Sequence, residues 1–261
     1  MQVMNIWKEF VGGLSTSLAF LTRLPLPSFL FRDAISADRA AWAFPLVGVL
    51  IGALQVLAVL ALSAMNVHPW VVAVVVIGGS LMLTGALHED GLADVADALG
   101  GGSREKKLSI MKDSRLGAFG VMAMVLMLML KGVLFFEIAR DFRLAQAAVV
   151  LIGAAVWSRA LMVLLWALLP AASVSGLGST RPGLNRALIA LGLAAVVLLV
   201  FLPVEPGLVL CCALWSIVVF ASFTIFALWQ FGGVTGDVCG AAQMLVELSF
   251  FAVALSLIGS W

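Results

Sequence analysis

The sequence predicts an all-α, polytopic integral membrane protein with about seven transmembrane helices (six to eight). Hydrophobic residues make up 63% of the 261 residues and charged residues only 11%, whereas a soluble domain carries roughly 25% charged residues. Seven apolar runs approach the length of about 20 residues that one helix needs to cross a bilayer. Basic residues also gather on one side of these runs. A soluble or disordered chain is excluded, and we expect residues 1–261 to form a single membrane-embedded domain.

The helices are expected in the following order. The segment Phe10–Leu21 is too short to span the membrane, so it predicts an interfacial or re-entrant helix. Seven longer runs follow it and predict the spans. They are Pro45–Ser63, Trp70–Leu87, Ala118–Ile138, Ala147–Leu169, Ala187–Pro203, Gly207–Trp229 and Ala241–Ser260.

The basic residues predict the orientation. Eleven of the 15 Lys and Arg residues fall on one side of the seven spans, and only Arg140 and Arg143 fall on the other. Basic loops stay in the cytoplasm, so the basic side is predicted to be cytoplasmic. The segments on that side are 1–44, 88–117, 170–186 and 230–240.

Most of the polar motifs lie in the same segments, which suits an enzyme with a cytoplasmic active site better than a transporter with a site at the midplane. A formal net charge of +1 gives no sign of a nucleic-acid partner. The three cysteines include the adjacent pair Cys211 and Cys212 within an apolar run. Their odd number and spacing argue against structural disulfides.

A cluster of acids lies between residues 88 and 97. If this stretch is a helix that continues the second span out of the membrane, Asp90, Asp94 and Asp97 lie within about 40° of one another. Three carboxylates on one face repel unless a cation lies between them, and oxygen ligands beside a phosphate suit Mg²⁺. We expect these three to bind the metal, with His88 and Glu89 as supporting or helix-end residues. The alternative is a solvated acidic helix end.

Two basic or glycine-rich stretches follow. In Gly100–Ser103, Gly101 and Gly102 would let backbone N–H groups approach a phosphate, or would form a hinge that ends the helix. In Met111–Arg115, a functional role is favoured. Lys112 and Arg115 are expected to neutralise phosphate charge, with Asp113, Ser114, Arg23 and Arg181 as further substrate-binding candidates. For Lys106 and Lys107, attraction to anionic lipid headgroups is favoured over a contact with the substrate phosphates.

Acids and bases also occur in or beside the last spans. Asp237 follows a glycine-rich turn and is expected either to complete the metal site or to cap the last helix. Glu247 would lie roughly 9 Å into the bilayer, and Arg159 in the fourth predicted span is a plausible partner. Lys131, nearer the outer end of its span, is expected to snorkel.

Six motifs occur together in order along the chain. They are Leu21–Pro27, Phe44–Gly48, His88–Asp94 with Asp97, Ile110–Gly117, Gly176–Gly178, and Gly232–Asp237 with Glu247. In these motifs the chain resembles the cobalamin synthase family, also called adenosylcobinamide-GDP ribazoletransferases. The resemblance runs nearly end to end. At Cys239 we would expect a large aliphatic residue, a departure that affects nothing catalytic.

The resemblance implies an enzyme of the bacterial inner membrane that uses Mg²⁺. Its substrates would be adenosylcobinamide-GDP and α-ribazole or its 5′-phosphate, and its second product GMP. Asp97 or Asp237 would accept the proton of the attacking ribazole hydroxyl. A homo-oligomer, or association with other enzymes of cobalamin assembly, stays open. The alternatives are a lipid enzyme like the CDP-alcohol phosphotransferases, which the acidic motif partly matches, and a cation-coupled transporter.

Overall fold

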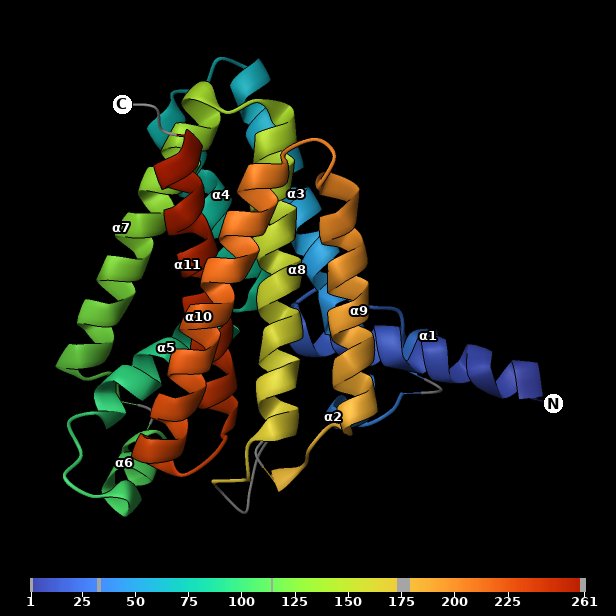
Figure 1. The fold of residues 1–261 in the computed structure, drawn as a ribbon, viewed down its shortest axis with the longest axis vertical. Coiled ribbons are helices and arrows are strands. Elements are labelled where there is room, and N and C mark those ends of the chain that lie inside the picture. Colours follow the sequence, from blue (N-terminus) through green and yellow to red (C-terminus); the bar gives the residue numbers. More distant parts are fainter. Residues whose placement is uncertain (1, 32–33, 114, 173–178, 259–261) are drawn as a thin grey trace.

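The protein is a bundle of long helices that run side by side, with shorter elements at one end (Figure 1). The computed structural model describes residues 2–31, 34–113, 115–172 and 179–258. The long helices are α3 (Phe44–Ala64), α4 (Pro69–Thr84), α7 (Ala118–Asp141), α8 (Leu144–Leu168), α9 (Leu184–Phe201), α10 (Pro206–Phe231) and α11 (Gly236–Ile258). The shorter ones are α1 (Gln2–Leu21), η1 (Ser28–Phe31), α2 (Ala37–Ala40), η2 (Ala41–Ala43), α5 (Leu87–Ala98) and α6 (Arg104–Ile110).

Among the described residues, six helices are long and apolar enough to cross a membrane, or seven if the bent pair α4 and α5 counts as one span. The all-α membrane bundle predicted from the sequence is therefore confirmed. Helix α8 is its centre, because 78% of its apolar window is buried, against 22–50% in the other five spans. Glycines allow α3 to approach α8 closely, since a Cβ atom on Gly48 would lie 2.6 Å from the carbonyl oxygen of Ala155.

Helix α1 extends sideways from the bundle, roughly across the direction of the long helices (Figure 1). It is not among the candidate spans, which agrees with the predicted non-spanning helix, although it begins earlier than expected. Its Trp7 and Phe10 side chains are exposed. Aromatic side chains on a helix of this orientation are typical of the membrane surface.

The acidic segment does not continue the second span, and this prediction is wrong. Helices α4 and α5 are bent by 88° at Gly85 and Ala86, which both adopt left-handed φ angles, of 66° and 54°. A left-handed glycine is a common way to end a helix. The side chain of Arg23 fills the space beside Gly85 where a Cβ atom would project. As a result, α5 lies across the end of the bundle rather than along its axis.

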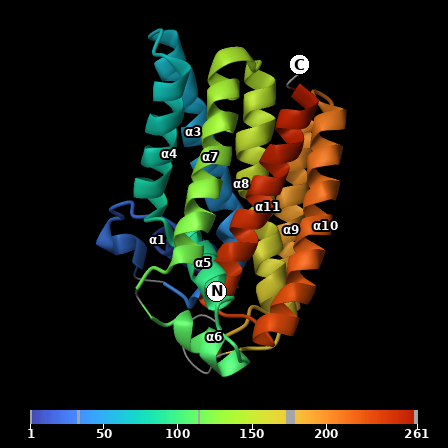
Figure 2. The ribbon, with the colours of Figure 1, turned by 90° about the vertical axis from the view of Figure 1, so that its left-hand side faces the viewer.

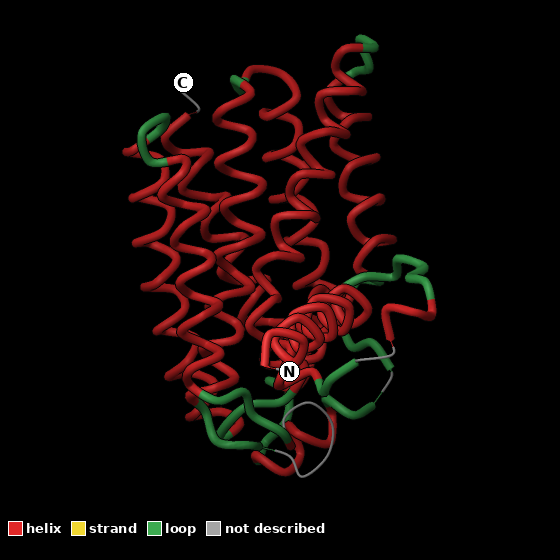
Figure 3. The backbone as a smooth tube through the Cα atoms, turned by 90° about the vertical axis from the view of Figure 1, so that its right-hand side faces the viewer, coloured by secondary structure: helices red, strands yellow, loops and turns green. Residues whose placement is uncertain are grey.

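The two ends of the bundle differ. The end with α1, α5 and α6 also carries the long connections, whereas short turns join α3 to α4, α7 to α8 and α9 to α10 at the other end (Figures 2 and 3). The described parts of the four segments predicted to share one side of the membrane do share one end of the bundle (Figures 1 and 2). Which side of the membrane this end faces stays a prediction.

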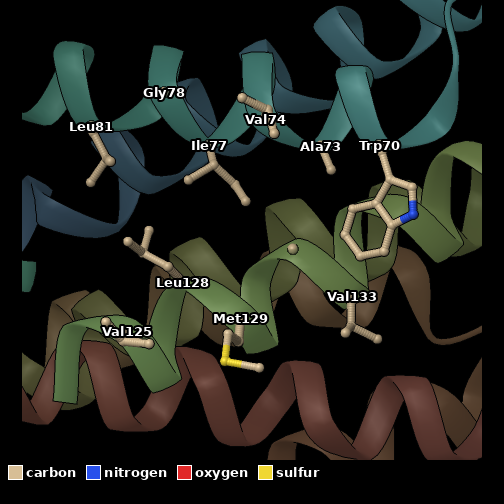
Figure 4. A pocket seen from close by; sticks show the side chains of 11 residues that line it. Trp70, Ala73, Val74, Ile77, Gly78, Leu81, Val125, Leu128, Met129 and Val133 are labelled. Carbon is tan, nitrogen blue, oxygen red and sulfur yellow. The ribbon is translucent and has the colours of Figure 1, made fainter. Parts of the chain in front are cut away.

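An apolar groove of about 590 Å³ lies between α4 and α7 on the side of the bundle. Its walls include Trp70, Ile77, Leu128 and Met129, and the side chains shown are hydrocarbon apart from one indole nitrogen and one thioether sulfur (Figure 4). A surface of this kind suits the hydrocarbon of the bilayer. It offers no acid or base for chemistry, which places the reactive site elsewhere.

Helix α5 packs tightly on the first turns of α11. A Cβ atom on Gly91 would lie 2.8 Å from the carbonyl oxygen of Asp237 and 3.2 Å from the Cα of Gly240. A Cβ atom on Gly240 would in turn lie 3.3 Å from the Cα of His88. The two helices are therefore in near backbone contact, and glycine is required at this crossing.

We predict that Gly91→Ala destabilises the detergent-solubilised protein by about 1–3 kcal/mol, because the added methyl group must push α5 away from α11. Gly78→Ala is the matched control, since a Cβ atom there meets nothing within 4 Å. It should be neutral or stabilise α4 by up to about 1 kcal/mol. Unfolding curves compare the two, and equal effects would disprove the close crossing.

Candidate active site

The acidic residues of α5 lie beside the start of α11. Asp90 is exposed, while Asp94 and Asp237 are half-buried. Burial and, after it, the nearby carboxylates of Asp90, Asp237 and Asp97 together raise the pKa of Asp94 to about 7. Four acids are thus close enough to repel one another. The structure places Asp237 beside the acidic helix, as the sequence predicted.

Asp97 has a contact that the sequence analysis missed. Its Oδ2 accepts the backbone N–H of Gly117 at 2.7 Å, and its Oδ1 accepts that of Gly120 at 2.8 Å. Both donors belong to the start of α7, where free N–H groups and the helix dipole favour a carboxylate. Asp97 therefore joins the end of α5 to α7. Its predicted role as metal ligand or proton acceptor stays a prediction.

A cavity of about 190 Å³ opens beside two of these acids. Asp90 and Asp237 lie on its wall together with Phe20, Phe44 and Trp166. The Phe20 and Phe44 rings stack with centroids 5.7 Å apart. The cavity therefore combines carboxylates with an aromatic wall contributed by α1, α3 and α8.

The acid cluster fits a divalent cation that is held jointly with a ligand. Among the described residues, no group of three or more acid, His or Cys side chains is already arranged to hold a metal. Mg²⁺ does not need such a cage, because it keeps water and is held by one or two carboxylates together with substrate phosphates. Burial and the neighbouring carboxylates raise the pKa of Asp94, so a bound cation would favour its ionised form. The donor set thus fits Mg²⁺.

The basic segment after α6 forms a local pair. Arg115 Nη2 lies 2.6 Å from Asp113 Oδ2, and the Arg115 side chain is 87% exposed. Hydrogen bonds from Arg115 lower the pKa of Asp113 to about 2. Lys112 is exposed, and Ser114 lies outside the described residues. The side chains of Lys112, Asp113 and Arg115 are at the same end of the bundle as the acids but do not line the 190 Å³ cavity.

The other predicted substrate contacts have local partners. Arg23 packs beside Gly85 at the α4–α5 break. Arg181 Nη2 donates to the carbonyl oxygen of Ala167 at 2.7 Å, at the end of α8. A positive charge at the C-terminus of a helix is favourable, which explains the position of Arg181 without a substrate.

The two glycines after α5 differ from each other. A Cβ atom on Gly101 would lie 2.9 Å from the backbone nitrogen of Lys107, while one on Gly102 would meet nothing within 4 Å. Gly101 is therefore needed for a close turn onto α6. Gly102 is open, and its predicted phosphate contact stays a prediction.

Beneath the acid cluster, a second group of charges is buried inside the bundle. Lys131 Nζ lies 3.2 Å from Glu89 Oε1 and 3.1 Å from Glu247 Oε1. Lys131 therefore does not snorkel, and that prediction is wrong, because two carboxylates pair with it in the interior. Arg159 Nη1 lies 3.9 Å from Glu247 Oε2, so Arg159 is beside Glu247 as predicted. His88 is also buried, at 2% exposure.

The fold and site together define a multi-pass membrane protein with a cluster of acids at one end of its bundle. Residues 13–255 match the model of the family described as cobalamin-5-phosphate synthase. The chain belongs to this family.

Curated relatives agree over nearly the whole chain. A protein of Sinorhizobium sp. named adenosylcobinamide-GDP ribazoletransferase is 38% identical over 95% of this chain and 98% of its own length. A protein of the same name from Shewanella pealeana is 38% identical over 99% of this chain and 100% of its own length. No solved structure matches significantly. The family makes the chain a transferase of cobalamin biosynthesis.

We predict that Asp97 and Asp94 affect stability in opposite directions. Asp97→Ala should destabilise the metal-free protein by about 0.5–2 kcal/mol, the typical cost of losing a helix cap. Asp94→Ala should leave the stability unchanged or raise it, because it removes a crowded carboxylate. Chemical unfolding in detergent without divalent cations measures both variants. A destabilisation by Asp94→Ala as large as that by Asp97→Ala would contradict the crowding.

Proposed function

We propose that this chain transfers the adenosylcobinamide-phosphate group of adenosylcobinamide-GDP to α-ribazole or α-ribazole 5′-phosphate and releases GMP. Near full-length similarity to proteins that carry this activity in their names supports the proposal. The observation in the structure that carries it is the convergence of acids from α5 and α11 at one end of the bundle. Transfer from a diphosphate is a reaction that acidic metal sites commonly perform.

We further propose that Asp90 and Asp94 hold Mg²⁺ together with the diphosphate, with Asp237 beside them and Asp97 as an additional candidate ligand. When bound, the ion would neutralise the diphosphate and the departing phosphate oxygens. The cavity beside Asp90 and Asp237 gives the substrates access to these acids.

The protein's own residues would complete the reaction. Asp237 is the better candidate for the base that takes the proton of the ribazole hydroxyl, because both oxygens of Asp97 already accept backbone N–H groups. Lys112 and Arg115 lie in an exposed segment that can approach a large substrate from the side of the solvent. Their charge would stabilise the transferred and departing phosphates.

We also propose that the site faces the cytoplasm from the bacterial inner membrane. The segments with most of the basic residues gather at the same end as the acids, and basic segments remain on the cytoplasmic side.

A transporter has little support. The buried charges of Glu89, Lys131, Arg159 and Glu247 pair with one another, and the cavity among them is only about 20 Å³. Such a space does not form a substrate pathway.

We predict that Asp237→Asn lowers GMP release by about a hundredfold, a typical loss for a general base. The N-cap of α11 is Thr235, whose Oγ1 accepts the backbone N–H of Val238 at 3.1 Å, so the unfolding curve should change little. The assay uses the purified, solubilised protein with Mg²⁺, adenosylcobinamide-GDP and α-ribazole. Asp141→Asn, at the other end of the bundle, is the control and should keep normal turnover. Normal turnover by Asp237→Asn would show that Asp237 is not the base.

Cysteine labelling of intact cells tests the orientation. A membrane-impermeant maleimide should label His68→Cys and Asp141→Cys, which lie at the end with short turns. It should label Ser103→Cys and Thr180→Cys only after the cells are broken. Labelling of Ser103→Cys in intact cells would reverse the proposed orientation.

A further inference from the structure

The charges inside the bundle form one connected network. Lys131 of α7 bridges Glu89 of α5 and Glu247 of α11, and Arg159 of α8 lies beside Glu247. Gln243 Nε2 adds hydrogen bonds to Glu247 Oε2 at 2.7 Å and to Ser158 Oγ at 3.0 Å. Two acids and two bases make the network neutral. Each of the four charged side chains is at most 8% exposed.

The network still has unmet hydrogen-bonding capacity. Four of its buried atoms have no partner: His88 Nε2, Glu89 Oε2, Arg159 Nε and Gln243 Oε1. All four residues line the same cavity of about 20 Å³. Buried polar groups without partners are rare and costly in native proteins. A cavity of this size is large enough for one water molecule, which needs roughly 10–15 Å³ of such space.

The hydrogen-bond chemistry of these four atoms matches one water molecule. Glu89 Oε2 and Gln243 Oε1 accept, Arg159 Nε–H donates, and His88 Nε2 does either according to its tautomer. A water molecule donates two hydrogen bonds and accepts up to two. It would therefore satisfy both acceptors through its own hydrogens and receive the hydrogen bond from Arg159.

The network is attached to α5 through Glu89, near the start of that helix. Glu89 directly precedes Asp90, and the α4–α5 break lies three residues before it. At the other end of α5, Asp97 holds the chain to α7. Helix α5 is thus tied to α7 at both ends, and its orientation sets where Asp90 and Asp94 point.

We propose that a trapped water molecule completes this neutral network, and that Glu89 and Lys131 are positioning residues that hold α5 so that its aspartates face α11. The catalytic consequence rests on the proposed function, whereas the water and the helix position do not. Partners that orient metal ligands in this way typically change metal affinity by about 10- to 100-fold when they are lost.

Hydroxyl-radical labelling tests for the water. Radicals generated by X-rays in internal water oxidise the side chains next to it. Met244 lines the cavity and is 1% exposed, whereas Met127 is similarly buried at 3% and lines none of the cavities described above. We expect Met244 to be oxidised clearly faster than Met127 in the folded, solubilised protein. Equally slow oxidation of Met244 and Met127 would overturn the proposal of a trapped water molecule.

Spin-label distances test the position of α5. Labels at Leu87→Cys on α5 and Leu184→Cys on α9, both exposed sites, in a Cys211→Ser background, should give one narrow distance distribution. Glu89→Gln with Lys131→Met removes the link without leaving an unpaired buried charge, because Glu247 keeps Arg159. The distribution should then broaden or shift. An unchanged distribution would overturn the proposal.

The control neutralises an ion pair that lies within α7, Glu137→Gln with Arg140→Met. The charges of this pair lie 2.8 Å apart, at the end of the bundle away from α5. This control should keep the narrow distribution. If the double variant fails to fold, Glu89→Gln alone is used, since Lys131 keeps Glu247 at 3.1 Å. It should broaden the distribution too, while Lys131→Arg, which keeps the charge, should not. A narrow distribution for Glu89→Gln would again overturn the proposal.

Catalysis provides the second readout. The Glu89 and Lys131 variants should need about 10–100 times more Mg²⁺ for half-maximal GMP release, with little change in the KM for α-ribazole. An unchanged Mg²⁺ requirement with altered label distances would overturn the catalytic consequence alone. Absence of GMP release by the unmodified protein would overturn the proposed function and leave the label-distance test unaffected.

Discussion

The close crossing of α5 and α11 is the constraint on which the acidic site depends. Gly91 and Gly240 let the two backbones approach until a single added carbon would collide. The 88° bend after α4 brings α5 to this crossing. Without the bend, Asp90 and Asp94 would follow the axis of the bundle and lie away from Asp237. The geometry of the site therefore comes from backbone conformation before any side-chain chemistry.

The acids of the site crowd one another. The nearby carboxylates and partial burial disfavour ionisation of Asp94, and proteins tolerate such crowding mainly where function requires it. The protein offsets this crowding with firm attachments on either side of it. Asp97 satisfies two backbone donors of α7, and Glu89 pairs with Lys131 inside the bundle. The acids are thus displayed on a helix that is held at both ends.

The sequence predicted the architecture well because the length of an apolar run reflects the thickness of the bilayer, and the distribution of basic residues reflects which loops share one side of it. It also predicted that Asp237 would lie beside the acidic helix, since the number of spans determines which loops share an end. It could not reveal the bend at Gly85 and Ala86, because an apolar run looks the same whether the helix is straight or broken. Helical spacing likewise grouped Asp97 with Asp90 and Asp94, but its backbone contacts with Gly117 and Gly120 depend on how α7 begins. Lys131 appeared isolated because its partners Glu89 and Glu247 are distant in the sequence.

The central claim is that Asp90 and Asp94 of α5 hold a metal ion together with a diphosphate, with Asp237 of α11 beside them. The most direct test is a structure of the protein with Mn²⁺ and adenosylcobinamide-GDP, in which anomalous scattering locates the metal. The account predicts one or more Mn²⁺ peaks between the diphosphate and the carboxylates of Asp90 and Asp94, with Asp237 adjacent. A diphosphate bound away from α5, with no metal at these carboxylates, would contradict it.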